Sequence, residues 1–192
     1  KRRKILLTRI DHKCIIEAVI AVCDDTEFNY EFVNVDNKGF IDFADLESKI
    51  SEDVLLFSYI LVNNEIGTIQ DYDRIHTLCS KYDIIIHTDA AQAPTTLNLS
   101  NISLKVDMLS LSGHKMYGPM GIGALFIEQK LQSKISPIFF GGGQQNNIRS
   151  GTLPLPLCAG MSKAAEICMN ENENDHKKIT KLKNYFVDKT RL

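Results

Sequence analysis

Polar side chains with catalytic potential follow three apolar segments of the sequence, 54–63, 84–88 and 106–111. They supply two amides, a carboxylate, a hydroxyl, an imidazole and an amine: Asn64, Asp89, Gln92, Ser112, His114 and Lys115. Parallel α/β sheets bind ligands at the carboxyl ends of their strands, so one site could gather all of these groups. Each residue alone also has an ordinary interpretation, since a lysine in such a place is usually solvated and an aspartate usually caps a helix.

Lys115 has the most specific chemistry of this set. It lies in a turn bounded by glycines, next to Ser112, His114 and Tyr117, and these neighbours can bind an anion. An amine held at a strand end can form a Schiff base with a carbonyl compound, and we expect its burial to favour the neutral, nucleophilic form. If the carbonyl compound is pyridoxal phosphate, its ring nitrogen needs a carboxylate partner, for which Asp89 is the candidate.

The hydrophobic pattern predicts a sheet that could position these residues. Strand-like and helix-like segments alternate, which is typical of an α/β fold with a mostly parallel sheet sandwiched by helices. The expected strands are 4–8, 29–35, 54–63, 84–88, 106–111 and 122–127. The expected helices are 12–22, 42–50, 73–82, 155–169 and 176–190, the second with Asp42 as its N-cap.

The helix expected at 155–169 carries a stripe at helical spacing, Cys158, Met161, Ala165 and Cys168, which predicts a buried face. The polar segment 170–175 follows it and is the expected linker to the last helix. All five cysteines are interpreted as small buried hydrophobic residues.

Composition argues against several classes of protein. Lys and Arg number 22 and Asp and Glu 24, so the net charge of −2 lacks the basic excess that nucleic acid or an anionic membrane would attract. The longest uncharged apolar segment, 54–62, is less than half of the roughly 20 residues that a membrane-spanning helix needs. Five cysteines without a C-x-x-C pair predict neither a disulfide framework nor a metal site, and favour a reducing compartment.

Four strings carry a resemblance to a known family: VNNEIGTIQ at 62–70, HTDAAQA at 87–93, LSGHKMYGPMGIGALFI at 111–127 and GGGQQNNIRSGTLP at 141–154. Together with DHKC at 11–14, they resemble the cysteine desulfurases that supply sulfur for iron-sulfur clusters. These enzymes belong to the class V aminotransferase group of fold-type I pyridoxal phosphate enzymes. The HKC and TDAAQA strings are more similar to the mitochondrial branch than to bacterial members.

The resemblance implies a role for each residue that faces the pyridoxal phosphate ring. Lys115 would hold the cofactor as a Schiff base and move protons at the substrate carbon. Asp89 would pair with the pyridine nitrogen, and Gln92 would hydrogen-bond the phenolic oxygen. His12 would stack on the ring, and Asn64 would lie beside the substrate and the phenolic oxygen.

The resemblance further implies a phosphate site and a dimer. Ser112 and His114 would hold the cofactor phosphate, and Thr152 would reach the phosphate of a neighbouring subunit in a homodimer. His87 is interpreted as a packed strand residue, His76 as a surface residue on its helix, and His176 as a linker residue without a role.

The sequence departs from the family pattern in three places. Gln145 and Asn146 replace a glutamate and an arginine, while Arg149 is retained, and Met120 replaces a lysine at an expected surface position. The family's loop cysteine, its upstream Gly-Ala-Thr phosphate loop and its carboxylate-binding arginine have no counterpart among these residues. We therefore expect residues 1–170 to be the central part of an incomplete cofactor domain, and 171–192 a linker and helix leading toward a small domain.

The activity that the resemblance implies is pyridoxal phosphate-dependent conversion of L-cysteine to L-alanine, with the sulfur passed on as an enzyme persulfide. The implied partners are an iron-sulfur scaffold protein as sulfur acceptor and, for a mitochondrial member, an LYR-type accessory subunit and acyl carrier protein. The expected location is the mitochondrial matrix in a eukaryote and the cytoplasm otherwise. Two alternatives stay open: another class V enzyme, such as a selenocysteine lyase or an aminotransferase, and a truncated homologue without turnover.

Overall fold

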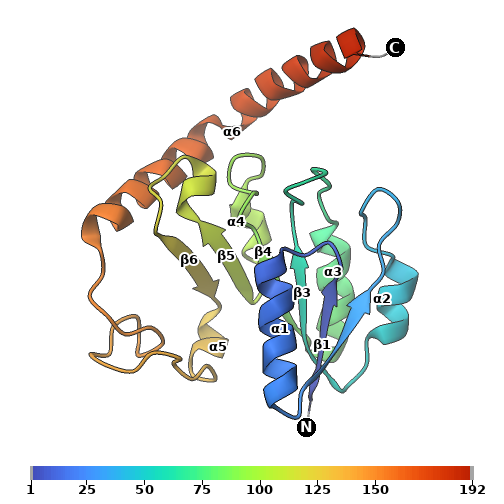
Figure 1. The fold of residues 1–192 in the computed structure, drawn as a ribbon, viewed down its shortest axis with the longest axis vertical. Coiled ribbons are helices and arrows are strands. Elements are labelled where there is room, and N and C mark those ends of the chain that lie inside the picture. Colours follow the sequence, from blue (N-terminus) through green and yellow to red (C-terminus); the bar gives the residue numbers. More distant parts are fainter. Residues whose placement is uncertain (1, 191–192) are drawn as a thin grey trace.

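The computed structural model describes residues 2–190 and is built on one sheet with the strand order β2-β1-β3-β4-β5-β6 (Figure 1). The strands are β1 Lys4–Thr8, β2 Asn29–Val33, β3 Val54–Ile60, β4 Ile85–Asp89, β5 Met108–Ser112 and β6 Gly123–Ile127. The first five pair in parallel, and β6 pairs antiparallel with β5. All six expected strands are confirmed, as is the mostly parallel sheet.

The helices connect and cover these strands. They are α1 Lys13–Asp25, α2 Phe43–Lys49, α3 Tyr72–Cys79, α4 Leu99–Ile102, α5 Gln129–Gln132 and α6 Leu155–Thr190, with short 3-10 helices η1 Ser80–Tyr82 and η2 Gly113–Met116. The expected cap of α2 is confirmed, because the Asp42 carboxylate accepts hydrogen bonds from the backbone N–H groups of Ala44 and Asp45.

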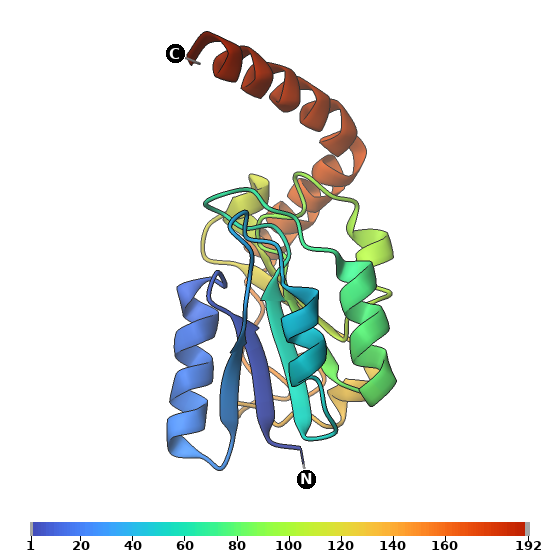
Figure 2. The ribbon, with the colours of Figure 1, turned by 90° about the vertical axis from the view of Figure 1, so that its right-hand side faces the viewer.

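Opposite faces of the sheet are covered by different helices (Figures 1 and 2). α1 packs through Val19 against Ile5 and Leu7 on one face. On the other face α2, α3 and α4 contribute Leu46, Ile75 and Ile102 to the main core. The chain runs from β1 outward to β2 and then crosses back to β3 on the other side of β1. The strand order therefore reverses between β1 and β3, where open α/β sheets form a ligand crevice at the carboxyl ends of their strands.

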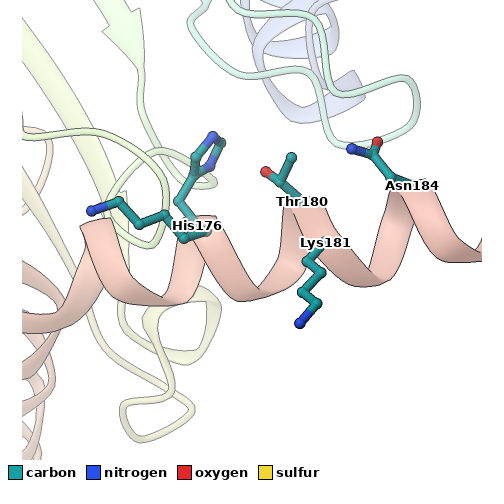
Figure 3. Close-up of a pocket in the computed structure, with 5 residues that line it drawn as sticks. His176, Thr180, Lys181 and Asn184 are labelled. Carbon is teal, nitrogen blue, oxygen red and sulfur yellow. The ribbon is translucent and has the colours of Figure 1, made fainter.

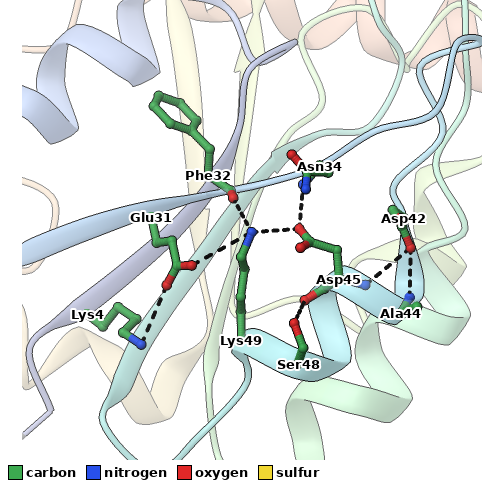
Figure 4. A network of polar contacts seen from close by, with 9 residues as sticks. All are labelled: Lys4, Glu31, Phe32, Asn34, Asp42, Ala44, Asp45, Ser48 and Lys49. Atoms are coloured by element: carbon green, nitrogen blue, oxygen red, sulfur yellow. Dashed lines mark hydrogen bonds and ion pairs between the residues drawn. The ribbon is translucent and has the colours of Figure 1, made fainter.

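One polar network ties α2 to β2 on the side of the sheet away from β6 (Figure 4). Lys49 donates to the carboxylate of Asp45 and to the carbonyl of Phe32, both at 2.7 Å, and lies 3.7 Å from Glu31. Asp45 also accepts from the backbone N–H of Asn34 at 2.7 Å. Every charge in this network has a partner within the fold.

The expected linker is wrong: 170–175 continues the helix, so α6 is a single helix of 36 residues. This segment holds asparagine and acidic residues but neither glycine nor proline, and polar exposed residues do not end a helix by themselves. Ion pairs at i,i+3 spacing, Lys163 with Glu166 and Lys178 with Asp175, add local support. The second half of α6, which carries the exposed His176, extends away from the sheet (Figures 1 and 2).

The expected buried stripe of α6 is confirmed in part. Met161 and Cys168 are buried, while Cys158 and Ala165 are half-buried and Ala164 is buried in addition. The interpretation of every cysteine as buried is wrong for Cys14, which is exposed in the first turn of α1, and overstated for the half-buried Cys23 and Cys158.

Candidate active site

The loops that follow β1, β3, β4 and β5 meet at the end of the sheet where the parallel strands have their carboxyl ends. We call this end the carboxyl edge and the opposite end the amino edge. Three hydrogen bonds join them in succession: Asn63 Nδ2 to the carbonyl of Ile10 (3.0 Å), the N–H of Leu61 to the carbonyl of Asp89 (2.9 Å), and the N–H of Ala90 to the carbonyl of Ser110 (3.0 Å). His12, Asn64, Asp89 and Ser112 lie on or next to these joined segments. The structure therefore brings the expected residues of four different strand ends to one edge.

Asp89 is the last residue of β4 and is only 7% exposed. Its Oδ1 accepts from the backbone N–H of Ala91 at 2.9 Å. Among the described residues, no lysine, arginine or histidine forms an ion pair with Asp89. A buried carboxylate with an unfilled need for a positive partner fits a protonated ring nitrogen, which is the role expected of this residue.

His87 lies two residues before Asp89 on the same face of β4 and is a packed strand residue, as expected. Its Nδ1 lies 2.8 Å from the hydroxyl of Ser58 and its Nε2 lies 2.8 Å from the hydroxyl of Ser110. Burial lowers the pKa of His87, although the charge of Asp89 opposes this effect. The neutral ring then donates one hydrogen bond and accepts the other, and so links β3, β4 and β5 one layer of side chains before Asp89.

The turn that carries Lys115 is shaped by close backbone contacts. The N–H of Gly118 donates to the carbonyl of Gly113 at 2.9 Å, and a Cβ at Gly118 would lie 2.8 Å from that oxygen. Tyr117 is left-handed with φ of 63°, which few residues other than glycine and asparagine adopt. Only glycine fits at 113 and 118, so the spacing of GHKMYG specifies the turn.

The first half of α6 supports this turn from behind. Met116 is buried against Met161 and Cys168, and Cys168 Sγ lies 3.7 Å from the Met116 carbonyl. The neighbouring Lys115 side chain is exposed, so the expected burial of its amine is wrong in this structure. A single side-chain anchor in the turn leaves the adjacent amine free to face a ligand.

Ser112 and His114 stand together at the start of the same turn, as their expected joint role requires. The Ser112 hydroxyl lies 3.1 Å from His114 Nδ1, Ser112 is half-buried and His114 is exposed. The hydroxyl and the imidazole are therefore available to one ligand group at the end of β5.

His12 is the N-cap of α1, and its ring is exposed. The backbone N–H of Cys14 donates to His12 Nδ1 at 3.3 Å, and Cys14 Sγ lies 3.0 Å from the same nitrogen. Partial burial and the charge of Asp89 raise the pKa of Cys14, so its thiol stays protonated at neutral pH. The start of α1 lies near the end of β4, because Asp11, the residue before His12, bonds the backbone of Ile60, and Ile60 is paired with Asp89.

Within VNNEIGTIQ, most polar residues build the loop. Asn63 Oδ1 accepts from the N–H groups of Glu65 and Ile66, and Gln70 bonds the backbone of Gly39 and Ile41. Asn64 is exposed and is the amide of this string left for a ligand, and Gln92 is half-buried after β4.

Thr152 is the expected site residue that the structure does not bring to this cluster. It is exposed in the loop before α6 and lines a cavity of about 890 Å³, together with residues of β6, of the glycine-rich loop and of α6. In that loop, Gln145, Asn146 and Asn147 are consecutively left-handed, a conformation that asparagine tolerates better than most residues. Whether Thr152 serves a neighbouring subunit stays a prediction.

A second hollow lies along the exposed half of α6 (Figure 3). His176, Thr180 and Asn184 follow one another at four-residue spacing along the helix, and Lys181 points away from them. All of its lining residues come from this one helix. This hollow therefore does not bring together side chains from different elements, as the strand ends do.

Asp11 is a residue of the site that the sequence analysis did not single out. It is 6% exposed, and its oxygens accept from the backbone N–H groups of Thr8 (2.8 Å) and Ile60 (2.7 Å). Burial raises the pKa of Asp11 to about 7 against the lowering effect of these hydrogen bonds, and the charge of Asp89 adds to the rise. The signal in the sequence was its position, three residues after the end of β1 and directly before His12.

His76 is partly buried rather than on the surface, with Nδ1 2.9 Å from the carbonyl of Lys105. Met120 is exposed, as expected. Across residues 2–190, no three His, Cys, Asp or Glu side chains are grouped so that they could hold a metal ion. In the same part of the chain, no helix is long and apolar enough to cross a membrane.

Comparison with known proteins identifies the family of this chain. The model of the family described as aminotransferase class V matches residues 1–191. The mitochondrial cysteine desulfurase of Saccharomyces cerevisiae is 41% identical over 186 residues, which are 97% of this chain and 37% of that protein. The chain thus spans somewhat more than a third of this relative's length.

Solved structures have the same fold. A protein described as NifS-like superposes with a TM-score of 0.92 and 33% identity, over 98% of this chain and 51% of the other. SspA in complex with cysteine superposes with a TM-score of 0.79 and 36% identity, over 86% of this chain and 47% of the other.

Proposed function

The chain belongs to the aminotransferase class V family, and we propose that it carries the cofactor-binding core of a pyridoxal phosphate-dependent cysteine desulfurase. The observation that supports this most is that His12, Asp89 and Lys115 lie at or just after the carboxyl ends of β1, β4 and β5, on the same edge of the sheet. The yeast relative is named as a mitochondrial cysteine desulfurase, and the SspA structure was solved with cysteine. The substrate of this chain would accordingly be L-cysteine.

The residues of this edge fit pyridoxal phosphate by their chemistry. Asp89 would hold the protonated ring nitrogen, Ser112 and His114 would bind the phosphate, and Lys115 would hold the aldehyde carbon. Bound there, the cofactor would withdraw electrons from the substrate through its cationic ring.

The remaining side chains would orient the ring and move protons. His12, at the start of α1, would cover one face of the ring. Gln92 and Asn64 carry amides that would hydrogen-bond its phenolic oxygen. The Lys115 amine would take the proton from the substrate Cα as a general base and return a proton to the product, which would be L-alanine.

Sulfur transfer needs a thiolate that attacks the substrate sulfur. Burial raises the pKa of Cys79 to about 12 and also raises the pKa of Cys168. Partial burial also raises the pKa of Cys14, and the charge of Asp89 further disfavours its thiolate. None of these three has the lowered pKa of a reactive cysteine, so we propose that a thiol other than these receives the sulfur as a persulfide.

The partners and location follow from the same proposal. An iron-sulfur scaffold protein would accept the sulfur, and Thr152 would contact the cofactor phosphate of a second subunit in a homodimer. The mitochondrial name of the yeast relative favours the mitochondrial matrix, where an LYR-type subunit and acyl carrier protein would also bind.

Two other functions have specific support. The replacement of the family's glutamate and arginine by Gln145 and Asn146 favours a homologue without turnover. The Asp89, Gln92 and Lys115 set is shared by class V selenocysteine lyases and aminotransferases, as the resemblance implies. Alanine release measured from cysteine and from selenocysteine separates the enzymes, because activity confined to selenocysteine contradicts a desulfurase.

The proposal is tested by adding pyridoxal phosphate to the protein and recording visible absorption. We expect a band that borohydride reduction abolishes while fixing a pyridoxyl group on Lys115, and no such band in Lys115→Ala. Lys130→Ala is the matched control, since Lys130 is an exposed lysine paired with Asp107 before β5. Equal bands in wild type and Lys115→Ala would contradict the assignment of this lysine.

A further inference from the structure

The Asp11 carboxylate occupies the point where the strand order reverses. Thr8, whose N–H donates to one oxygen, ends β1, and Ile60, whose N–H donates to the other, ends β3. These strands are neighbours in the sheet but their connections leave in opposite directions. A single side chain therefore bridges the two walls of the crevice in which α/β sheets bind ligands.

Asp11 also determines where α1 begins. The segment between β1 and α1 comprises only residues 9–12, and the carboxylate folds this segment back onto the strand it has just left. His12 is the next residue and caps α1. Loss of the carboxylate would leave two buried backbone N–H groups without acceptors, so this loop is held more firmly than a surface loop of equal length.

The same carboxylate is linked to Asp89 through one strand residue. Ile60 is paired with Asp89 in the register of β3 and β4, and Leu61 donates to the Asp89 carbonyl at 2.9 Å. The position of Ile60 is thus tied to Asp11 on one side and to Asp89 on the other.

We propose that Asp11 is a positioning residue that sets the distance of the His12 ring from Asp89, and so the gap into which the pyridine ring of pyridoxal phosphate fits. The inference rests on the proposed function and deepens it, because it adds a residue that touches neither cofactor nor substrate. Asp11 acts through His12 and through the backbone of β3.

Asp107 provides a matched control within the same sheet. It lies before β5, and its Oδ2 accepts from the backbone N–H of Ile86 in β4 at 2.8 Å, at the edge opposite the candidate site. Both acids therefore hold a strand N–H through a carboxylate. Only Asp11 does so beside the candidate site.

The experiment measures the dissociation constant of pyridoxal phosphate by the visible band, with hydrogen exchange at the amides of Thr8 and Ile60. We expect Asp11→Asn to weaken cofactor binding at least about 10-fold and to speed exchange at one or both amides, because the variant has one fewer acceptor oxygen. We expect Asp107→Asn to bind the cofactor as wild type does. A wild-type dissociation constant for Asp11→Asn would overturn the inference.

A double-mutant cycle keeps the inference testable if Asp11→Asn also lowers stability. When Asp11 acts through His12, Asp11→Asn combined with His12→Ala should weaken binding no more than about twofold beyond His12→Ala alone. Fully additive losses would show that Asp11 does not work through His12 and would overturn the inference. Absence of a Lys115-dependent band in the wild-type protein would instead refute the proposed function, so the two failures are distinguishable.

Discussion

The two edges of the sheet treat charge in opposite ways. At the amino edge, where β1 and β5 begin, Lys4 lies between Glu31 and Asp53, and Asp107 pairs with Lys130. At the carboxyl edge, Asp11, Asp89, His114 and Lys115 take part in none of the ion pairs formed among residues 2–190. Both edges are built from the same strands, so the difference is not imposed by the fold.

This difference indicates which edge has a ligand to accommodate. Charges that serve only solubility and stability can pair with one another, as Lys49 and Asp45 do in Figure 4. Keeping a carboxylate such as Asp89 buried without a cation costs free energy, which a fold retains where a bound group supplies the missing charge. The carboxyl edge therefore has the electrostatic character of a binding site.

The largest expected effect comes from removing the buried charge of the carboxyl edge. Asp89→Asn removes the negative charge that would keep the cofactor's ring nitrogen protonated, while preserving the side-chain shape. We expect alanine release from cysteine to fall by about 100- to 10,000-fold, a range typical of groups that control a proton in catalysis. Asp107→Asn, at the other edge, should change the rate less than about twofold. Comparable losses in both variants would mean that the edges are not functionally distinct.

The pH dependence of stability provides the next largest effect. Asp11 has an ordinary pKa of 3.8 and a pKa of about 7 in the folded protein, chiefly because of burial. Between these values the folded chain binds more protons than the unfolded chain, so the free energy of unfolding should decrease as pH rises from about 4 to about 7. The decrease is at most about 4 kcal/mol, and urea unfolding across this range measures it.

Asp11→Asn should flatten this slope, and an unchanged slope would assign it to other groups. Asp45 makes the opposite contribution: burial alone would raise its pKa, but hydrogen bonds from Asn34 and Lys49 together with the charge of Lys49 lower it. Its stabilising effect is complete above its ordinary pKa and is lost only as pH falls below that value. Asp45→Asn should therefore leave the slope between pH 4 and pH 7 intact.

A smaller effect is expected from the packing behind the Lys115 turn. Met161→Ala removes a buried side chain that contacts Met116, and should lower the free energy of unfolding by about 2 kcal/mol, at the low end for such a change. The turn should also loosen, so the Lys115-dependent band should form with weaker cofactor affinity. Met169→Ala is the control, because Met169 is exposed on the same helix. Equal stability of the two variants would show that α6 does not support the turn.

The strands and most helices were predictable from sequence because apolar periodicity is a local property. The residues at the strand ends were predictable as well, since polar groups follow directly after apolar segments. Asp11 was not, because its hydrogen bond to Ile60 joins positions 49 residues apart in the sequence. The continuous α6 was missed because the polarity of 170–175 was interpreted as a break, although no residue in it disfavours a helix strongly.

The smallest expected effect concerns the amino edge itself. Lys130 is exposed and pairs with both Asp107 at 2.9 Å and Glu128 at 2.6 Å. Exposed ion pairs contribute about 0–1 kcal/mol each, and Asp107 keeps its hydrogen bond to Ile86 when Lys130 is removed. Lys130→Ala should therefore lower the free energy of unfolding by less than about 1 kcal/mol and leave cofactor affinity unchanged. A larger loss, or an effect on cofactor binding, would mean that charge pairing at one edge controls geometry at the other, and the two edges would then have to be regarded as one coupled unit.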